Sequence, residues 1–268
     1  MSLAPVYAGD SGVGYLLYDD QGPDGSKHDS NGHTKGGLVF DSSGGFWLVH
    51  SVPRFPYFAK DGYDTFPTEE DKYGQSFLCL GLGSLGDVDD VAGQFYYNHG
   101  YVFDSFVPDD LASKVANVVS AVNMEHSTEP EFNTLDIKTG DGQRWTSFAK
   151  TSQWGKQLYE ELVAATYEVP LSVETWMNGI NPLPSYCAPD YTYSVVNVRT
   201  LAIGGASWKE TQDHSKWAVS QDGSTPIVCI GDINRQKSQA GRAGGTVCTQ
   251  HNGLWQLFSG IISDADSC

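Results

Sequence analysis

The segment His33-Thr-Lys-Gly-Gly-Leu-Val-Phe-Asp41 recurs in the second half of the chain as His214-Ser-Lys-Trp-Ala-Val-Ser-Gln-Asp222. His, Lys and Asp match without a gap, and the register continues into a second apolar run, which places Arg54 over Arg235. Each half then reads as His-x-Lys, a strand, an Asp/Gly turn and a second strand. We interpret the match as a duplicated unit, which predicts two halves related by a pseudo-two-fold axis.

The rest of the chain mixes short strands with helical segments. Apolar, strand-like runs occur at 15–18, 37–40, 46–49, 76–79, 194–198 and 227–230, and helical spacing of apolar residues occurs at 109–122 and 154–165. This mixture predicts an α/β protein in which each half is a mixed β-sheet flanked by helices. The Gly/Asp-rich stretch 139–143 marks the boundary, so we expect an N-terminal half at 1–140 and a C-terminal half at 141–268.

Composition favours a globular protein and raises one objection to a nucleic-acid substrate. The 40% hydrophobic content indicates a packed core, whereas a net charge of −17 would repel DNA at neutral pH. No apolar run is long enough to cross a membrane, and the first residues lack the basic and apolar regions of a signal peptide. We therefore expect no membrane partner.

The five cysteines predict an oxidising compartment. No Cys-x-x-Cys pair occurs, so a structural zinc site is not expected. The spacing predicts the disulfides Cys229–Cys248, between two strand-like runs, and Cys187–Cys268, which would fix the C-terminal tail. Cys79 is predicted to be a free thiol, and scattered buried thiols remain the alternative interpretation.

The repeated His-x-Lys motif suits the chemistry of a phosphodiester. Two residues apart on a strand, the imidazole and the ammonium share one face. A two-fold axis would bring His33, Lys35, His214 and Lys216 into one pocket. One neutral His could attack phosphorus, the other could protonate the leaving oxygen, and the two Lys could stabilise charge on the phosphate oxygens. We therefore predict a phosphodiesterase that needs no metal and no cofactor.

The paired His-x-Lys pattern resembles the phospholipase D superfamily, although the spacing to Asp41 and Asp222 is one residue longer than in its usual motif. The chain resembles the deoxyribonuclease II family more closely. The segments that carry this resemblance are Gly32-His-Thr-Lys-Gly, Gly44-Gly-Phe-Trp-Leu-Val-His-Ser-Val-Pro, Tyr73-Gly-Gln-Ser, Ser147-Phe-Ala-Lys, Asp213-His-Ser-Lys-Trp and Gly231-Asp-Ile-Asn-Arg.

The resemblance to the deoxyribonuclease II family implies an acid-active endonuclease that cleaves DNA without metal and leaves 3′-phosphate ends. His33, Lys35, His214 and Lys216 would be its catalytic residues. His50 lies in a matching motif, and Asn234 occupies a position similar to that of a polar residue in phospholipase D-like enzymes. For His50 and Asn234, a supporting role in the site and a purely structural role remain equally open.

Two other functions compete with this interpretation. One is a phospholipase D-like phosphodiesterase that acts on a non-DNA diester such as a phospholipid. The other is a non-enzymatic binding module rich in aromatic residues, in which His33 and His214 would lie far apart. The expected partner is DNA, and the chain could form a homodimer. The compartment would be secreted, periplasmic or lysosome-like and acidic. His28, His99, His126 and His251 are expected to lie on the surface.

Overall fold

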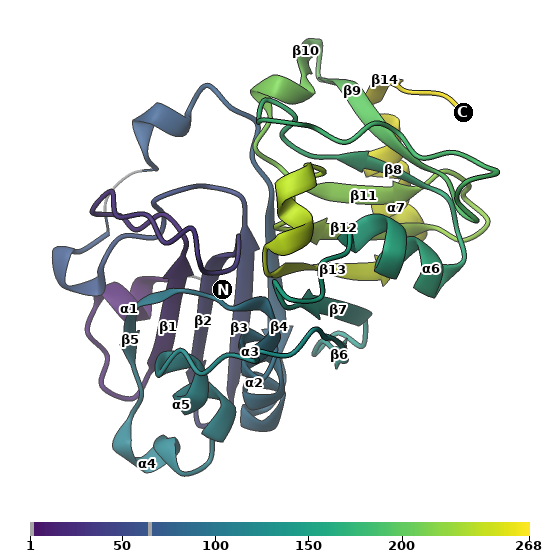
Figure 1. Ribbon diagram of the computed structural model, residues 1–268. Helices are drawn as coiled ribbons and strands as arrows, with labels where there is room; N and C mark the ends of the chain where they lie inside the picture. The colour runs from purple at the N-terminus through teal and green to yellow at the C-terminus, as the bar shows by residue number, and fades with distance from the viewer. Residues whose placement is uncertain (1–2, 64–65) are drawn as a thin grey trace.

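A computed structural model describes residues 3–63 and 66–268. The chain forms two β-sheets that lie side by side, and their strands run in nearly perpendicular directions in Figure 1. The predicted α/β class is confirmed in its coarse form, because short helices pack on both sheets. Within the described residues, no helix is both long and apolar enough to cross a bilayer.

The first sheet has five antiparallel strands in the order β4-β3-β2-β1-β5. Their bounds are β1 Gly14–Asp19, β2 Lys35–Asp41, β3 Gly44–His50, β4 Phe77–Leu82 and β5 Val102–Phe106. The strands are apolar on both faces, because a helical layer covers one face and the N-terminal segment covers the other. The connection from β3 to β4 contains two short 3-10 helices, η1 (Ala59–Asp61) and η2 (Thr68–Glu70).

The second sheet is larger and mixed, in the order β10-β9-β8-β11-β12-β13-β7-β6, with β14 paired to β9. Only β8 and β9 pair in parallel, among the pairs of named strands in the described part of the chain. The bounds are β6 Phe132–Lys138, β7 Arg144–Lys150, β8 Leu171–Glu174, β9 Val195–Ile203, β10 Ala206–Lys209, β11 Trp217–Ser220, β12 Ile227–Gly231, β13 Gly244–Gln250 and β14 Ile262–Ala265.

Helices are short and lie between the strands. Their bounds are α1 Ala4–Tyr7, α2 Leu85–Ala92, α3 Phe95–Asn98, α4 Asp109–Ala112, α5 Ala116–Val122, the π-helix η3 Tyr159–Val163, α6 Ala164–Tyr167, η4 Glu210–Gln212, η5 Lys237–Gly241 and α7 Asn252–Gly260.

The expectation of one helix over 109–122 is wrong. The chain forms α4 and α5 instead, and Val115 between them has a non-helical backbone. Asp89 on α2 accepts hydrogen bonds from the backbone N–H groups of Asn117 and Val118, which start α5. The Asp89 side chain, from another helix, thus caps the start of α5, although the local apolar pattern predicts one continuous helix. The helix expected at 154–165 begins only at Tyr159, after a turn in which Gly155 has a φ of +69°.

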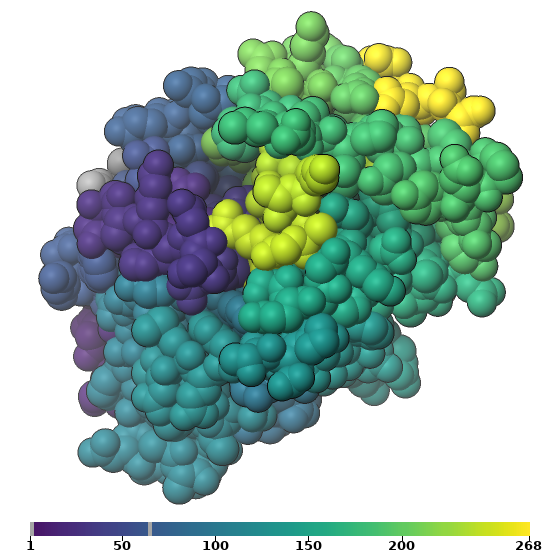
Figure 2. Space-filling view, in the orientation of Figure 1, coloured from purple at the N-terminus to yellow at the C-terminus, as the bar shows by residue number. Residues whose placement is uncertain are grey.

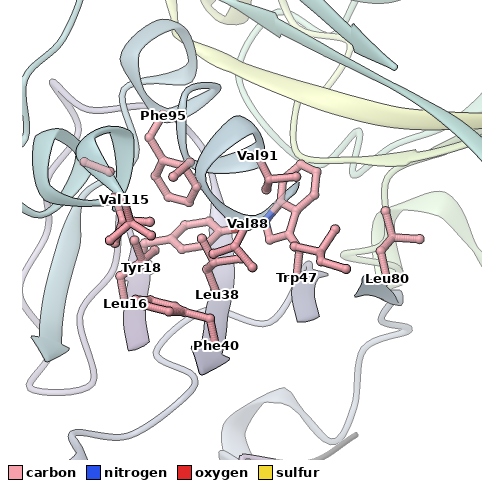
Figure 3. Close-up of a cluster of buried hydrophobic side chains, with 14 of the residues drawn as sticks. Leu16, Tyr18, Leu38, Phe40, Trp47, Leu80, Val88, Val91, Phe95 and Val115 are labelled. Carbon is pink, nitrogen blue, oxygen red and sulfur yellow. Dashed lines mark hydrogen bonds between the residues drawn. The ribbon is translucent and has the colours of Figure 1, made fainter. Parts of the chain in front are cut away.

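The first sheet packs one face against α2, α3 and α5. Leu16 and Tyr18 alternate with Leu17 along β1, so they face the helices, whereas Leu17 faces Val6 on the other side. Figure 3 shows Val88, Val91 and Phe95 from the helical layer lying over Tyr18, Leu38 and Trp47. Trp145 and Val247 of the second sheet belong to the same cluster, so the two sheets share one core at their junction.

The strand orders of the two sheets correspond. The strand order β4-β3-β2-β1 in the first sheet corresponds to the order β13-β12-β11-β8 in the second. In both sheets each neighbouring pair of these strands is antiparallel. The boundary expected at 140/141 falls in the turn between β6 and β7, and both of these strands belong to the second sheet. The division at this residue therefore stays a prediction.

Both predicted disulfides are confirmed. Cys187 forms a disulfide with the C-terminal Cys268, and Cys229 on β12 forms one with Cys248, which lies directly opposite it on β13. Cys79 on β4 is a free, exposed thiol, also as predicted.

Candidate active site

The His-x-Lys pattern predicts His33 on a strand, but His33 lies at a bend just before β2. Its backbone N–H donates to the carbonyl oxygen of Ala243 at 2.9 Å. Its ring Nδ1 lies 2.6 Å from the carbonyl oxygen of Asp232. The preceding Gly32 donates its N–H to the carbonyl of His99, and a Cβ at Gly32 would lie 1.8 Å from the carbonyl oxygen of Asn98. Only glycine fits there, so the backbone of α3 fixes the approach to His33.

His214 likewise precedes its strand, β11, instead of lying within it. Its backbone N–H donates to the carbonyl of Gly74 at 2.8 Å, and its Nδ1 lies 3.0 Å from the Glu70 carboxylate. The ring of Tyr73 stacks on the imidazole with centroids 4.1 Å apart, and Trp176 meets it edge-on at 4.6 Å. His214 is buried, and its Nε2 has no hydrogen-bond partner within residues 3–63 and 66–268.

Each histidine is thus held by the opposite half of the chain. His33 binds Asp232 and Ala243, which flank β12 and β13, and His214 binds residues between β3 and β4. This exchange draws the two motifs to the junction of the sheets. Figure 2 shows a recess in the surface between the purple N-terminal segment, the blue connection from β3 to β4 and the yellow-green segment around η5.

Lys35 and Lys216 are both buried, but their surroundings differ. Lys35 donates to Asp20 and lies 3.5 Å from Asp19. Burial alone would lower the pKa of Lys35, but Asp20 and Asp19 raise it above its usual value. Lys216 has no such carboxylate pair among the described residues, and its Nζ donates to the carbonyl of His214. Burial and the charge of Lys35 lower the pKa of Lys216 to about 7.

The charges of the two motifs act on each other across the junction of the sheets. Burial lowers the pKa of His33 well below its usual value, and the charges of Lys35 and Lys216 lower it further. Asp20 acts in the opposite direction. The charge of Lys216, from the other half, therefore reaches His33, and the charge of Lys35 reaches Lys216.

Three buried carboxyl groups complete this region. Burial raises the pKa of Asp19 to about 8 and raises that of Asp232 well above its usual value. Burial acts on Asp20 too, but the charges of Lys35, His33 and Arg242 together hold its pKa below the usual value. Arg242 binds the second Asp20 oxygen at 2.6 Å. Asp20 therefore links a lysine of the first half to an arginine of the second.

The two supporting candidates are both buried at this place in the fold. His50 ends β3, accepts the Val52 N–H at Nδ1 and leaves Nε2 without a partner among the residues that the structure describes. Burial and the charge of Lys35 lower the pKa of His50 to about 3. Asn234 follows β12, and its Oδ1 likewise has no partner in the described part of the chain. Buried polar atoms are normally hydrogen-bonded, so these two atoms are available to a ligand.

The matched aspartates of the repeat do not reach this region. Asp41 and Asp222 are exposed, and each accepts the backbone N–H of the residue two positions later in a turn. They shape the hairpins β2–β3 and β11–β12. The resemblance left their role open, and the structure gives them this structural one.

Sequence reasoning missed residues that contact the motifs, among them Asp20, Glu70 and Asp232, and it missed Arg242, which binds Asp20. Asp232 lies inside a quoted segment, Gly231-Asp-Ile-Asn-Arg, which was a usable signal. Glu70 is one carboxylate in an acidic run, and nothing local distinguishes it. The expectation of a surface position is wrong for His99, which is buried and stacks on His126. Over residues 3–63 and 66–268, no three His, Cys, Asp or Glu side chains are grouped to hold a metal ion.

Comparison with known proteins gives consistent matches over the chain. The family model described as Deoxyribonuclease II matches residues 1–268. Plancitoxin-1 of Acanthaster planci is 38% identical over 97% of this chain and 73% of its own length. Deoxyribonuclease-2-alpha of Mus musculus is 37% identical over 100% of this chain and 76% of its own. Cell-death-related nuclease 7 of Caenorhabditis elegans is 33% identical over 100% and 72%.

Proposed function

The chain belongs to the deoxyribonuclease II family and is a nuclease of that type, and on this premise we propose a mechanism for it. We propose that it is an acid endonuclease that hydrolyses DNA phosphodiester bonds without metal, through a phosphohistidine intermediate, and leaves 3′-phosphate ends. The observation that carries the proposal is the exchange of contacts between the halves, which brings His33 and His214 to one junction.

We propose that the two halves are phospholipase D-like units related by a pseudo-two-fold axis. In support, equivalent residues make equivalent bonds. In the first half, the backbone N–H of Ser51 donates to the carbonyl of Ser76. At the equivalent position in the second half, the backbone N–H of Asp232 donates to the carbonyl of Gly245. The backbone N–H groups of the matched residues Arg54 and Arg235 donate to side-chain oxygens at equivalent register positions, Asp19 and Thr175. The division into 1–140 and 141–268 is part of this proposal.

His33 is the proposed nucleophile. If its Nδ1 donates its proton to the carbonyl of Asp232, Nε2 keeps a free lone pair. Burial, Lys35 and Lys216 keep the pKa of His33 low, so the ring stays neutral in acid. Nε2 attacks phosphorus, and the bond from phosphorus to the 5′-oxygen breaks.

His214 is the proposed general acid. The Glu70 carboxylate, 3.0 Å from Nδ1, stabilises the protonated ring, so that Nε2 can give its proton to the leaving 5′-oxygen. In the second step, neutral His214 takes a proton from water, whose oxygen attacks phosphorus. The bond between phosphorus and His33 breaks, which restores the enzyme and leaves a 3′-phosphate.

Lys35 and Lys216 are proposed to stabilise charge on the phosphate oxygens, in unequal degree. Lys35 already has the Asp20 carboxylate as a counter-ion, whereas Lys216 has no carboxylate partner in the part of the chain described. Lys216 therefore has the larger capacity to respond to a phosphate. His50 Nε2, which has no partner among the described residues, could donate to the same anion, whereas Asn234 Oδ1 can only accept a hydrogen bond.

Acid conditions favour this mechanism. At low pH the repulsion between DNA and a chain of net charge −17 falls, because part of the carboxylates become neutral and most exposed His become charged. Two disulfides suit an oxidising compartment. We therefore propose a secreted, periplasmic or lysosome-like setting. DNA is favoured over a phospholipid diester because the similar proteins are named as deoxyribonucleases.

Cleavage of a supercoiled plasmid at about pH 5 in the presence of EDTA tests the proposal. The expected products are nicked and linear DNA with 5′-hydroxyl and 3′-phosphate ends. A polynucleotide kinase should label the 5′ ends without prior phosphatase treatment, and a polymerase should extend the 3′ ends only after phosphatase treatment. Strict dependence on added Mg²⁺, or 5′-phosphate products, would refute the mechanism. Cleavage of a phospholipid but not of DNA would favour the alternative substrate.

A further inference from the structure

Lys150, the last residue of β7, is a fully buried cation without an ion-pair partner in the described residues. Its Nζ donates to three backbone carbonyls, those of Gln239 at 3.2 Å, Ala240 at 3.0 Å and Arg242 at 2.5 Å. An ammonium group has three protons, and all three therefore find an acceptor at the end of η5. Burial lowers the pKa of Lys150 to about 8, so the group keeps its charge under acid conditions.

The segment that Lys150 gathers continues directly into contacts with the His33 segment. The side chain of Arg242 binds Asp20 at 2.6 Å and the carbonyl of Asn31 at 3.2 Å. The next residue, Ala243, accepts the backbone N–H of His33 at 2.9 Å. Residues 239–243 thus lie between Lys150 on one side and His33 with Asp20 on the other.

A buried ammonium is a costly way to fill space. Without a carboxylate, its desolvation must be offset by hydrogen bonds, and an apolar side chain of similar length would fill the same volume at no such cost. Unlike an apolar side chain, the ammonium group holds three carbonyl oxygens of one loop around a single point. The charge of Lys150 also reaches the buried His99, whose own carbonyl accepts the N–H of Gly32.

We infer that Lys150 is a positioning residue of the reaction, which holds residues 239–243 so that Ala243 and Arg242 fix the His33 segment for attack. The inference rests on the proposed role of His33. Lys150 itself does not contact His33, and its effect passes through the backbone of the loop.

The test replaces Lys150 by methionine, which keeps the length and removes the charge and the donors. We expect kcat to fall about 10- to 100-fold, because a misplacement of about 1 Å is enough for such a loss. KM should change less than about threefold, since the loop does not carry the proposed phosphate-binding lysines. Lys138→Met is the matched control. It removes an exposed lysine from β6 in the same hairpin and should leave kcat unchanged.

A second readout does not depend on activity. Amide hydrogen exchange should speed up in Lys150→Met at residues 32–35 and 239–245 and remain as in the wild type in β1 and β12. Lys150→Arg keeps the charge and several donors, so it should recover part of both the rate and the protection. It also serves as the working variant if Lys150→Met does not fold.

The inference is overturned if Lys150→Met keeps its kcat within twofold, or if either variant loses activity with unchanged protection of residues 32–35. His33→Ala is assayed in parallel. If His33→Ala remains active, the proposed mechanism fails. If it is inactive while Lys150→Met is fully active, only the role of Lys150 fails.

Discussion

Glu70 places a carboxylate oxygen 3.0 Å from Nδ1 of His214, and the two residues come from opposite halves of the chain. Glu70 is itself held by the Arg54 guanidinium at 3.2 Å and by the Gln75 amide at 3.3 Å. The charge of His214 and that of Arg54 outweigh burial and lower the pKa of Glu70. In the described part of the chain, the His33 ring has no such carboxylate partner, and its Nδ1 meets a backbone carbonyl instead. This difference assigns the two histidines different roles in our proposal.

Glu70→Gln should lower kcat by about 10²-fold, because the neutral amide no longer stabilises the protonated general acid. KM should change little. Steady-state kinetics at pH 5 measures both. The matched control is Glu69→Gln, which removes the same charge from the neighbouring exposed position and should act like the wild type. Equal losses in both variants would show that only net charge matters here.

His33→Ala and His214→Ala should each abolish cleavage, and the double variant should be no worse than the single ones, because the two rings act in one mechanism. Base-quenched samples of the wild type during turnover should carry phosphate linked to His33, detected by mass spectrometry, because a phosphohistidine is stable in base and hydrolyses in acid. His251→Asn, which retains a side chain able to cap α7, is the control. Phosphate found on His214 in the wild type would reverse the assignment.

The rate should follow a bell-shaped pH profile with its maximum near about 5. The rate falls in stronger acid as the nucleophile becomes protonated. It falls above neutrality because the pKa of Lys216 is lowered to about 7, so its positive charge is lost there. Initial rates in buffers of constant ionic strength from pH 3 to 9 give the profile. A maximum at pH 8 would contradict both the charge argument and the two-histidine mechanism.

Leu48→Cys should form a disulfide with Cys79. Leu48 on β3 lies directly opposite Cys79 on β4, as Cys229 on β12 lies directly opposite Cys248 on β13. The repeat makes these two pairs equivalent. Closing this loop of about 30 residues should stabilise the protein by up to about 3 kcal/mol. Thiol counting and thermal unfolding, with and without reductant, measure the two effects. Two free thiols in the oxidised variant would argue against equivalent strand geometry in the halves.

Glu174→Gln should unfold at a higher temperature than the wild type at pH 8 and at a similar one at pH 4. Burial, with the charges of Asp213 and Glu210, raises the pKa of Glu174 to about 10, and neither carboxyl oxygen has a hydrogen-bond partner among the described residues. Because the pKa of Glu174 is higher in the folded than in the unfolded protein, its contribution to folding stability is fully present below the unfolded-state pKa and is lost as the pH rises toward 10. Glutamine does not ionise, so the variant does not lose stability in this way. A pH-independent difference between the two proteins would contradict the assigned shift.

The sequence by itself determined the strands, the two motifs and the family. Apolar runs such as 46–49 report strand positions because neighbouring side chains alternate between the two faces of a sheet, and this pattern is local. The disulfides were also predictable, since the spacing of Cys229 and Cys248 fits two adjacent strands. The repeat of His-x-Lys is visible because a duplicated unit keeps its register along the chain.

Only the tertiary structure decided what surrounds those motifs. Glu70 reaches His214, and Asp232 and Ala243 reach His33, across more than a hundred intervening residues. Contacts of this kind leave no periodic signal, because they depend on how two sheets meet and not on neighbouring residues. The same is true of the unequal environments of Lys35 and Lys216. Their motifs read alike in sequence, yet Asp19 and Asp20 pair with one lysine, whereas burial lowers the pKa of the other.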